Sequence, residues 1–242
     1  DPWGTVKATM EQLVVTDRAH SPLWAGKRSA DRHCETHRIP LEDVKVSAKG
    51  LGGTINDLFV TAVVGAVAKY HDKRGAGVEE FRVSIPLNTR SDKSVGGNNF
   101  VPARVLLNAS LDPRARFAAI TARLNDVKNS RDPGLGWALA GLFTSLPSPL
   151  LVAVARQQIE TVDFACSNVR GAPFPLWVSG ARVLANHPMG PTGGTATNAT
   201  VMSYEGSLDL GLVSDPAAVD DPAQLRDLIA EEFDELIALG AR

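Results

Sequence analysis

The stretch TINDLFVTAVVGAVAKY, residues 54–70, predicts the central element of the fold. Thr54 and Asp57 have the spacing of a capping box, in which the hydroxyl and the carboxylate satisfy backbone N–H groups that a first helical turn leaves unpaired. Apolar residues then recur at the 3.6-residue spacing of a helix and also fill most positions between. We therefore expect a helix that is buried on nearly all sides.

Strand and helix patterns alternate on both sides of this helix. A period of two, typical of strands, marks residues 33–39, 81–85, 100–107, 162–169, 178–184, 199–204 and 208–212. The Asp-Pro pairs 112–113 and 221–222 combine an N-cap with a proline suited to the first helical turn. Shorter helices are expected at 6–15, after Pro40 and within 137–155. This order predicts an α+β fold (an α/β sandwich) with a mixed β-sheet flanked by helices.

Composition limits the classes of partner. The chain has 242 residues, 44% of them apolar, and 25 basic against 27 acidic residues give a formal net charge of −2. Nothing in this balance attracts a phosphate backbone, so we expect no nucleic-acid partner. The most apolar run, residues 58–68, has 11 residues, whereas a bilayer span needs ~20. The start of the sequence lacks a secretion-signal pattern, and we expect a cytoplasmic location.

Residues that often carry chemistry are sparse and have simpler explanations. His33, Glu35 and His37 could hold zinc only with a further ligand, and a hydrogen-bonded or solvated group is the better interpretation. Cys34 and Cys166 are the only cysteines, which excludes a disulfide framework and favours two packed small side chains. No G-x-S-x-G motif is present. We expect no metal site.

Polar residues gather instead at the ends of predicted elements. Asn56 and Asp57 lie at a helix N-terminus, where the dipole favours an anion or a developing oxyanion, although capping alone explains both. Asn88 and Arg90 follow a strand, where side chains line a crevice or stabilise a turn. Residues 167–173 are a strand running into a Gly/Pro turn, which favours a structural role.

Six short motifs occur in order along the chain. They are Thr54-Ile55-Asn56-Asp57, Ile85-Pro86-Leu87-Asn88-Thr89-Arg90, Gly97-Asn98-Asn99, Ser167-Asn168-Val169-x-Gly171, Pro175-Leu176-Trp177-Val178-Ser179-Gly180-Ala181-Arg182-Val183 and Ser203-Tyr204-Glu205-Gly206. Together they resemble the C-terminal half of the bacterial wax ester synthase/diacylglycerol acyltransferase family, in the chloramphenicol acetyltransferase-like superfamily. The likeness covers most of the chain, best from about residue 50 to 240.

The resemblance implies a fold, a reaction and a missing part. In that family two CoA-dependent acyltransferase-like domains face each other, and acyl-CoA and an alcohol meet in the channel between them. The implied reaction esterifies diacylglycerol or a long-chain alcohol to triacylglycerol or wax ester, with acyl-CoA as co-substrate and no bound cofactor. The family's general base is the second histidine of His-His-x-x-x-Asp-Gly, whereas the five histidines here are isolated from one another.

We therefore expect no catalytic residue in this chain and a base supplied by an N-terminal half. On this interpretation residues 1–50 are a crossover segment to that half, and residues 51–242 are the C-terminal acyltransferase-like domain. The partners implied are the N-terminal half, acyl-CoA and the alcohol. The protein is expected to act at the surface of the inner membrane or of lipid bodies. A non-catalytic lipid-binding or interaction module of the same fold is the alternative.

The resemblance also implies roles for individual residues. Candidates for the domain interface or substrate channel are Asn56, Asp57, Asn88, Arg90, Asn98, Ser167 and Asn168. Residues implied to be structural are Thr54, Pro86, Gly171, Trp177, Gly180, Arg182, Ser203 and Tyr204. Arg170 stands where the family usually has proline, so this loop departs from the family pattern.

Overall fold

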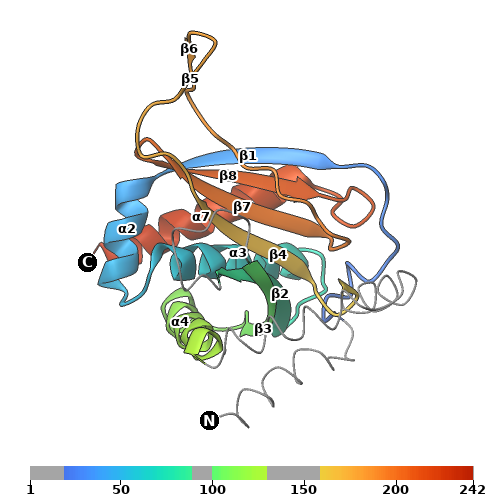
Figure 1. Ribbon diagram of the computed structural model, residues 1–242. Helices are drawn as coiled ribbons and strands as arrows, with labels where there is room; N and C mark the ends of the chain where they lie inside the picture. The colour runs from blue at the N-terminus through green and yellow to red at the C-terminus, as the bar shows by residue number, and fades with distance from the viewer. Residues whose placement is uncertain (1–18, 89–99, 130–158, 242) are drawn as a thin grey trace, which may run out of the picture.

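A six-stranded mixed sheet with helices packed on one face forms the body of the protein (Figure 1). The computed structural model describes residues 19–88, 100–129 and 159–241. In spatial order the strands are β1 (His33–Pro40), β8 (Ser207–Ser214), β7 (Thr197–Tyr204), β4 (Phe164–Arg170), β2 (Glu80–Asn88) and β3 (Phe100–Asn108). The helices are α2 (Leu41–Gly50), α3 (Ile55–Asp72), α4 (Pro113–Asn129) and α7 (Pro222–Gly240). The expected α+β fold is confirmed.

Three central strands run in parallel. β2 pairs with β4 and β4 pairs with β7 in parallel, and the register places Ser84 beside Ala165 and Ala165 beside Asn198. The outer pairs β2–β3, β7–β8 and β8–β1 are antiparallel. The carboxyl ends of β2, β4 and β7 therefore lie at one edge of the sheet.

Helix α3 is the buried helix that its sequence predicts. Every residue from Asp57 to His71 except Lys69 is buried. The capping box is formed, because the Thr54 hydroxyl accepts from the Asp57 backbone N–H and the Asp57 carboxylate accepts from the Thr54 backbone N–H. A helix without a solvent-facing side needs neighbours all round, and α4 and α7 supply them with the sheet.

A buried ion pair lies where α3, α4 and α7 meet. The Arg116 guanidinium contacts the Glu232 carboxylate, and both side chains are almost fully buried. Lys69 Nζ lies 2.8 Å from the same carboxylate. Gly65 faces this pair, and a Cβ there would overlap both Glu232 Oε2 and Arg116 Nη2. Glycine at this position of α3 therefore makes room for the charges.

The N-terminal described residues pack on the same core. Trp24 is 1% exposed and lies against the rings of Tyr70 and Phe164. β1 is the outer strand beside β8, and α2 packs against α7. The role of residues 1–50 as a link to a preceding half stays a prediction.

The expected single strand over residues 178–184 is wrong. The chain forms instead a short hairpin of β5 (Trp177–Val178) and β6 (Ala181–Arg182). Ser179 and Gly180 have φ values of 50° and 84°, which is the left-handed geometry of a tight two-residue turn. Glu205 and Gly206 repeat this geometry between β7 and β8, as their sequence predicts.

Some sequence predictions lie outside the described residues, namely the helices at 6–15 and within 137–155. Within the described ranges, no single helix has the length and apolar character of a membrane span. Among the described helices, α2 and α3 have this length and apolar character only when they are taken together, and they are separated by a bend of 94°.

Candidate functional site

One edge of the sheet collects most of the polar residues that the sequence singles out. At the opposite edge, His71 near the end of α3 is hydrogen-bonded to Ser21, and the Ser21 N–H donates to Asp163 just before β4. The end of α3 therefore lies beside the start of β4. Asn56 and Asp57 lie in the first turn of α3, whereas Asn88 and Asn168 lie near the carboxyl ends of β2 and β4.

The start of α3 holds a carboxylate with one unused oxygen. Asp57 is 1% exposed, and its Oδ2 accepts from the Thr54 N–H at 2.8 Å and from the Thr54 hydroxyl at 2.7 Å. Asp57 Oδ1 is buried without a hydrogen-bond partner among the described residues. Asn56 is half-buried and takes no part in the cap. Helix capping thus accounts for Thr54 and for one of the two carboxylate oxygens of Asp57, Oδ2.

Ser167 and Asn168 point to opposite faces of β4, because side chains alternate along a strand. Asn168 pairs with Val201, whose side chain belongs to the buried core under the helices. Ser167 pairs with Thr200 and faces the other side of the sheet. Of the two, only Asn168 is on the α3 side, and it is exposed.

The other interface candidates are placed only in part. Asn88 ends β2, four residues beyond Ser84, and therefore lies at the same edge as Asn168. Arg90 and Asn98 lie outside the described residues. The proposed roles of all seven candidates stay predictions.

A second group of motif residues builds an arm that projects from the sheet. The arm, residues 171–187, leaves after β4, turns at the β5–β6 hairpin and returns toward β7 (Figure 1). The Tyr204 hydroxyl is hydrogen-bonded to both legs of the arm, the segments before and after the hairpin. It accepts from the Leu176 N–H at 2.9 Å and donates to the Val183 carbonyl at 2.9 Å. Tyr204 thus links the two legs of the arm, and the structural role that the resemblance implies for it stays a prediction.

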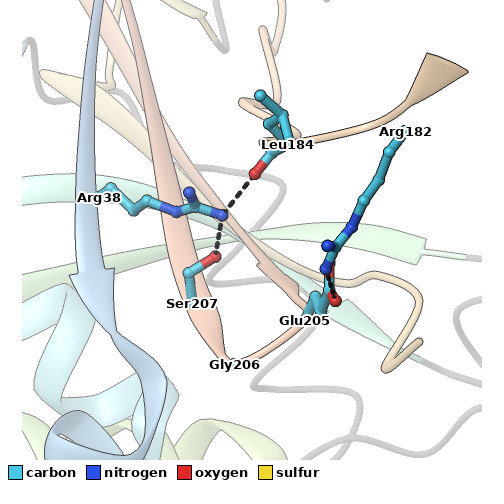
Figure 2. Close-up of a pocket in the computed structure, with 6 residues that line it drawn as sticks. All are labelled: Arg38, Arg182, Leu184, Glu205, Gly206 and Ser207. Carbon is cyan, nitrogen blue, oxygen red and sulfur yellow. Dashed lines mark hydrogen bonds and ion pairs between the residues drawn. The ribbon is translucent and has the colours of Figure 1, made fainter. Parts of the chain in front are cut away.

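A pocket of about 350 Å³ opens at the root of the arm (Figure 2). Arg38 Nε lies 3.0 Å from Asp209 Oδ1, and its Nη2 donates to the Leu184 carbonyl. Each arginine there has a carboxylate partner, so the pocket carries no excess positive charge. The lining residues are Arg38, Arg182, Leu184, Glu205, Gly206 and Ser207.

A buried serine–histidine pair lies near the end of α3, and no sequence pattern predicts it. Ser21 Oγ lies 2.7 Å from His71 Nε2, and His71 Nδ1 lies 2.7 Å from the Val67 carbonyl. Because a carbonyl can only accept, Nδ1 carries the hydrogen and Nε2 accepts from the hydroxyl. Burial lowers the pKa of His71, which keeps the ring neutral. Both residues are at most 1% exposed, so the pair holds the N-terminal segment rather than meeting substrate.

The described residues hold no cluster of three or more side chains suited to a metal ion. His33 Nε2 instead lies 2.7 Å from Glu35 Oε1 at the protein surface. Cys166 is fully buried, and burial raises the pKa of its thiol, which suits a packed side chain. Cys34 is exposed, so the expectation of a packed side chain is wrong for that cysteine.

This chain is similar to part of proteins that are named as acyltransferases. The model of the WS/DGAT C-terminal domain, WS standing for wax ester synthase and DGAT for diacylglycerol acyltransferase, matches residues 96–237. A putative diacylglycerol O-acyltransferase of Mycobacterium tuberculosis is 27% identical over 94% of this chain and 47% of its own length. Another from the same organism is 33% identical over 75% of this chain and 42% of its own. The chain spans about half the length of these relatives.

Solved structures share the fold. The wax ester synthase/diacylglycerol acyltransferase of Marinobacter aquaeolei VT8 superposes with a TM-score of 0.69 at 15% identity, covering 100% of this chain and 57% of that one. A condensation domain of the enacyloxin polyketide synthase gives a TM-score of 0.62 at 13% identity, over 98% of this chain and 47% of that one. These neighbours have the acyltransferase-like fold that the sequence motifs imply.

Proposed function

This chain belongs to the wax ester synthase/diacylglycerol acyltransferase family, whose C-terminal domain it contains, and we propose that the whole protein is an acyl-CoA-dependent O-acyltransferase. Its acceptor would be the hydroxyl of diacylglycerol or of a long-chain alcohol. The single observation that carries this proposal is the family match over residues 96–237. The relatives in Mycobacterium tuberculosis, named as putative diacylglycerol O-acyltransferases, support it.

In the proposed reaction a histidine from the other half of the protein takes the proton of the acceptor hydroxyl. The oxygen attacks the thioester carbonyl, the new C–O bond forms as the C–S bond breaks, and the thiolate leaves as CoA after taking up the proton. No covalent acyl-enzyme is needed, and acyl-CoA acts as co-substrate rather than as a resident cofactor. This chain would supply the opposite wall of the reaction channel.

The edge described above is the region of this wall that we propose to face the channel. In sheets with parallel strands, ligands often bind beyond the carboxyl ends, and the positive end of a helix dipole adds to that preference. Asn56 lies at the start of α3, and Asn88 and Asn168 lie near the carboxyl ends of β2 and β4. The amide groups of Asn56 and Asn168 would suit positioning of a polar substrate group rather than proton transfer.

The experiment that tests this proposal uses the full-length protein with palmitoyl-CoA and either dioleoylglycerol or hexadecanol. We expect release of free CoA with formation of triacylglycerol or wax ester in equal amounts. The control is the same protein with the proposed base histidine of the other half replaced by alanine, which should leave CoA release at the background rate. A folded full-length protein that forms neither ester would reject the proposal.

The alternative function is a lipid-binding or interaction module without turnover. The isolated positions of the five histidines in this chain favour it. A coding sequence for the other half without His-His-x-x-x-Asp-Gly, together with saturable palmitoyl-CoA binding and no ester product, would decide for the module. We place the protein in the cytoplasm at the surface of the inner membrane or of lipid bodies, which cell fractionation would test.

A further inference from the structure

Residues 19–32, which precede β1, form a strap that is attached to the core by side chains. The strap contains neither helix nor strand, and Trp24 within it is 1% exposed. The Trp24 ring packs against the rings of Tyr70, His71 and Phe164. A segment without regular structure depends on such contacts and on a few hydrogen bonds to keep its place, so it can open without the rest of the fold.

Ser21 joins the strap to α3 through hydrogen bonds that run in one direction. The Trp24 N–H donates to Ser21 Oγ at 3.1 Å, and Ser21 Oγ lies 2.7 Å from His71 Nε2. Because His71 Nδ1 is bonded to the Val67 carbonyl, Nε2 accepts the hydrogen of the Ser21 hydroxyl. A proton on Nε2 would turn this acceptor into a donor, and the hydroxyl hydrogen would lose its partner.

The surroundings of His71 disfavour a charged ring. Burial is the largest cause that lowers its pKa, and the charge of Arg74 lowers it further, whereas the Val67 carbonyl and Asp72 raise it. From β2 the Phe81 ring covers the imidazole, with the two ring centroids 5.0 Å apart. An imidazolium would therefore be more stable in water than in the closed strap.

A buried carboxylate lies on the other side of Ser21. Asp163, just before β4, is fully buried and accepts from the Ser21 N–H at 2.6 Å and from the Arg82 N–H at 2.7 Å. Burial raises the pKa of Asp163, while these two donors and the neighbouring His20 lower it. Because its pKa is raised overall, protonation of Asp163 favours the closed strap. Its effect is opposite to that of His71, and an experiment must separate the two.

The other end of the strap is held by contacts of a different kind. Ser29 donates from its N–H and from its hydroxyl to the Asp215 carboxylate, at 2.7 Å each, and Arg28 Nε donates to the Gly194 carbonyl at 3.1 Å. Burial acts to raise the pKa of Asp215, but the bonds from Ser29 and the charge of Arg32 lower it overall. This end therefore stays attached when the pH falls from 7.5 to 5.5.

We propose that residues 19–24 are held by an acid-sensitive attachment: a proton taken up by His71 Nε2 breaks the bond to Ser21 and releases this part of the strap, while residues 28–32 stay bound. The open strap hydrates the imidazole, so the proton binds more tightly in the open form and shifts the equilibrium toward it. With an ordinary histidine pKa of about 6.5 in the open form, opening should increase by up to about tenfold between pH 7.5 and 5.5.

Hydrogen–deuterium exchange of the full-length protein, followed by mass spectrometry of peptides, tests the attachment locally. The informative peptide covers residues 19–26, in which the N–H groups of Ala19, Ser21 and Trp24 are hydrogen-bonded in the closed strap. The reference peptide covers residues 225–236 of α7 and reports opening of the whole body. After correction for the intrinsic pH dependence of exchange, we expect residues 19–26 to exchange several-fold faster at pH 5.5 than at pH 7.5, with the reference unchanged.

His71→Gln is the matched variant, because the amide oxygen of glutamine can accept from the Ser21 hydroxyl but takes up no proton. We expect the acceleration at pH 5.5 to disappear in this variant. His33→Gln removes an exposed histidine and should keep the acceleration. Asp163 is present in all these proteins, so its opposite effect cancels in the comparison.

Equal acceleration in wild type and His71→Gln would overturn the proposal, and so would a wild-type strap whose exchange does not change with pH. Acceleration of residues 225–236 by the same factor would show unfolding of the whole body and would overturn local release. If the strap of His71→Gln exchanges freely already at pH 7.5, the two peptides of the wild type decide by the same criteria.

Ser21→Ala tests the bond from the other partner, because it removes the hydroxyl and keeps the N–H that binds Asp163. We expect residues 19–26 to exchange several-fold faster than in wild type at pH 7.5, with residues 225–236 unchanged. Exchange equal to wild type would overturn the Ser21–His71 bond as the attachment. None of these measurements needs turnover, so the proposal stands or falls independently of the proposed function.

Discussion

The helix layer under the sheet and the arm above it differ in how far their apolar side chains are buried. In the helix layer α3 is buried on nearly every side, and even the charges of Arg116 and Glu232 are paired out of water. In the arm, Trp177 and Val178 are exposed although they are apolar. Both regions are held by specific hydrogen bonds.

The difference shows which region of the molecule has its apolar side chains covered within this chain. The helix layer buries its apolar side chains and pairs Arg116 with Glu232 inside this chain, so substitutions there should change the stability of this chain directly. The arm is ordered at its root but uncovered at its tip, so substitutions at the tip should change stability only when a partner is present. The predictions below use this contrast.

The largest effect is expected at the buried ion pair. Arg116→Met leaves the fully buried Glu232 with only Lys69, and we expect a loss of about 3–5 kcal/mol in the free energy of unfolding. Urea denaturation measures it. The double variant Arg116→Met/Glu232→Met should recover most of this loss, because no unpaired carboxylate remains. A single variant as stable as the wild type would show that the helix layer does not depend on the pair.

The Ser21–His71 pair should make the stability of the body depend on pH. Burial lowers the pKa of His71, so the unfolded chain binds its proton at a higher pH than the folded chain does. The contribution is fully present above about pH 6.5, the ordinary value for histidine, and is lost as the pH falls toward the folded pKa. The slope is at most about 1.4 kcal/mol per pH unit.

Denaturation of wild type and His71→Gln between pH 7.5 and 5 measures this dependence. The variant should lose the histidine part of the slope. His33→Gln, which removes an exposed histidine, is the control and should keep it. Parallel curves for wild type and His71→Gln would show that His71 does not carry the pH dependence.

Two variants at the start of α3 distinguish a role in helix capping from a role in the proposed channel. Thr54→Ala removes the hydroxyl that caps the helix and should cost about 1 kcal/mol of stability. Asn56→Ala removes a side chain outside the cap and should cost less than about 0.5 kcal/mol. In the full-length protein Asn56→Ala should still reduce the proposed ester formation more than Thr54→Ala does. The reverse order of activities would assign the edge a structural role only.

The smallest effect is expected at the tip of the arm. Trp177→Ser should change the stability of the 242-residue chain by less than about 0.5 kcal/mol, because the side chain is 63% exposed. The same substitution should lower the melting temperature of the full-length protein by several degrees. A large loss in the 242-residue chain would mean that Trp177 packs on the body, which would remove the contrast between the two regions.

Local signals predicted most of the elements. The capping residues Thr54 and Asp221 begin α3 and α7 as expected, because a side chain that bonds the first turn acts within three or four residues. The turn at Glu205-Gly206 between β7 and β8 was predicted from equally local residues. The prediction of one strand over 178–184 was wrong because its alternating pattern concealed the turn at Ser179 and Gly180.

The site was predicted less completely, since its parts come together across the chain. The strand predicted over 162–169 places Ser167 and Asn168 on opposite faces, but the sequence does not show which of these faces carries α3. Ser21 and His71 are 50 residues apart, and no pattern in the sequence connects them.

The sequence by itself determined the identity of the elements, the α+β class and the family, because these depend on residue periodicity, capping chemistry and short motifs. Only the tertiary structure decided that the carboxyl ends of β2, β4 and β7 lie on one side of the sheet, and that Tyr204 binds both legs of an arm whose apolar tip is exposed. Strand order and long-range hydrogen bonds depend on which distant segments share a core. That choice is made by the free energy of the whole chain and not by any local stretch of it.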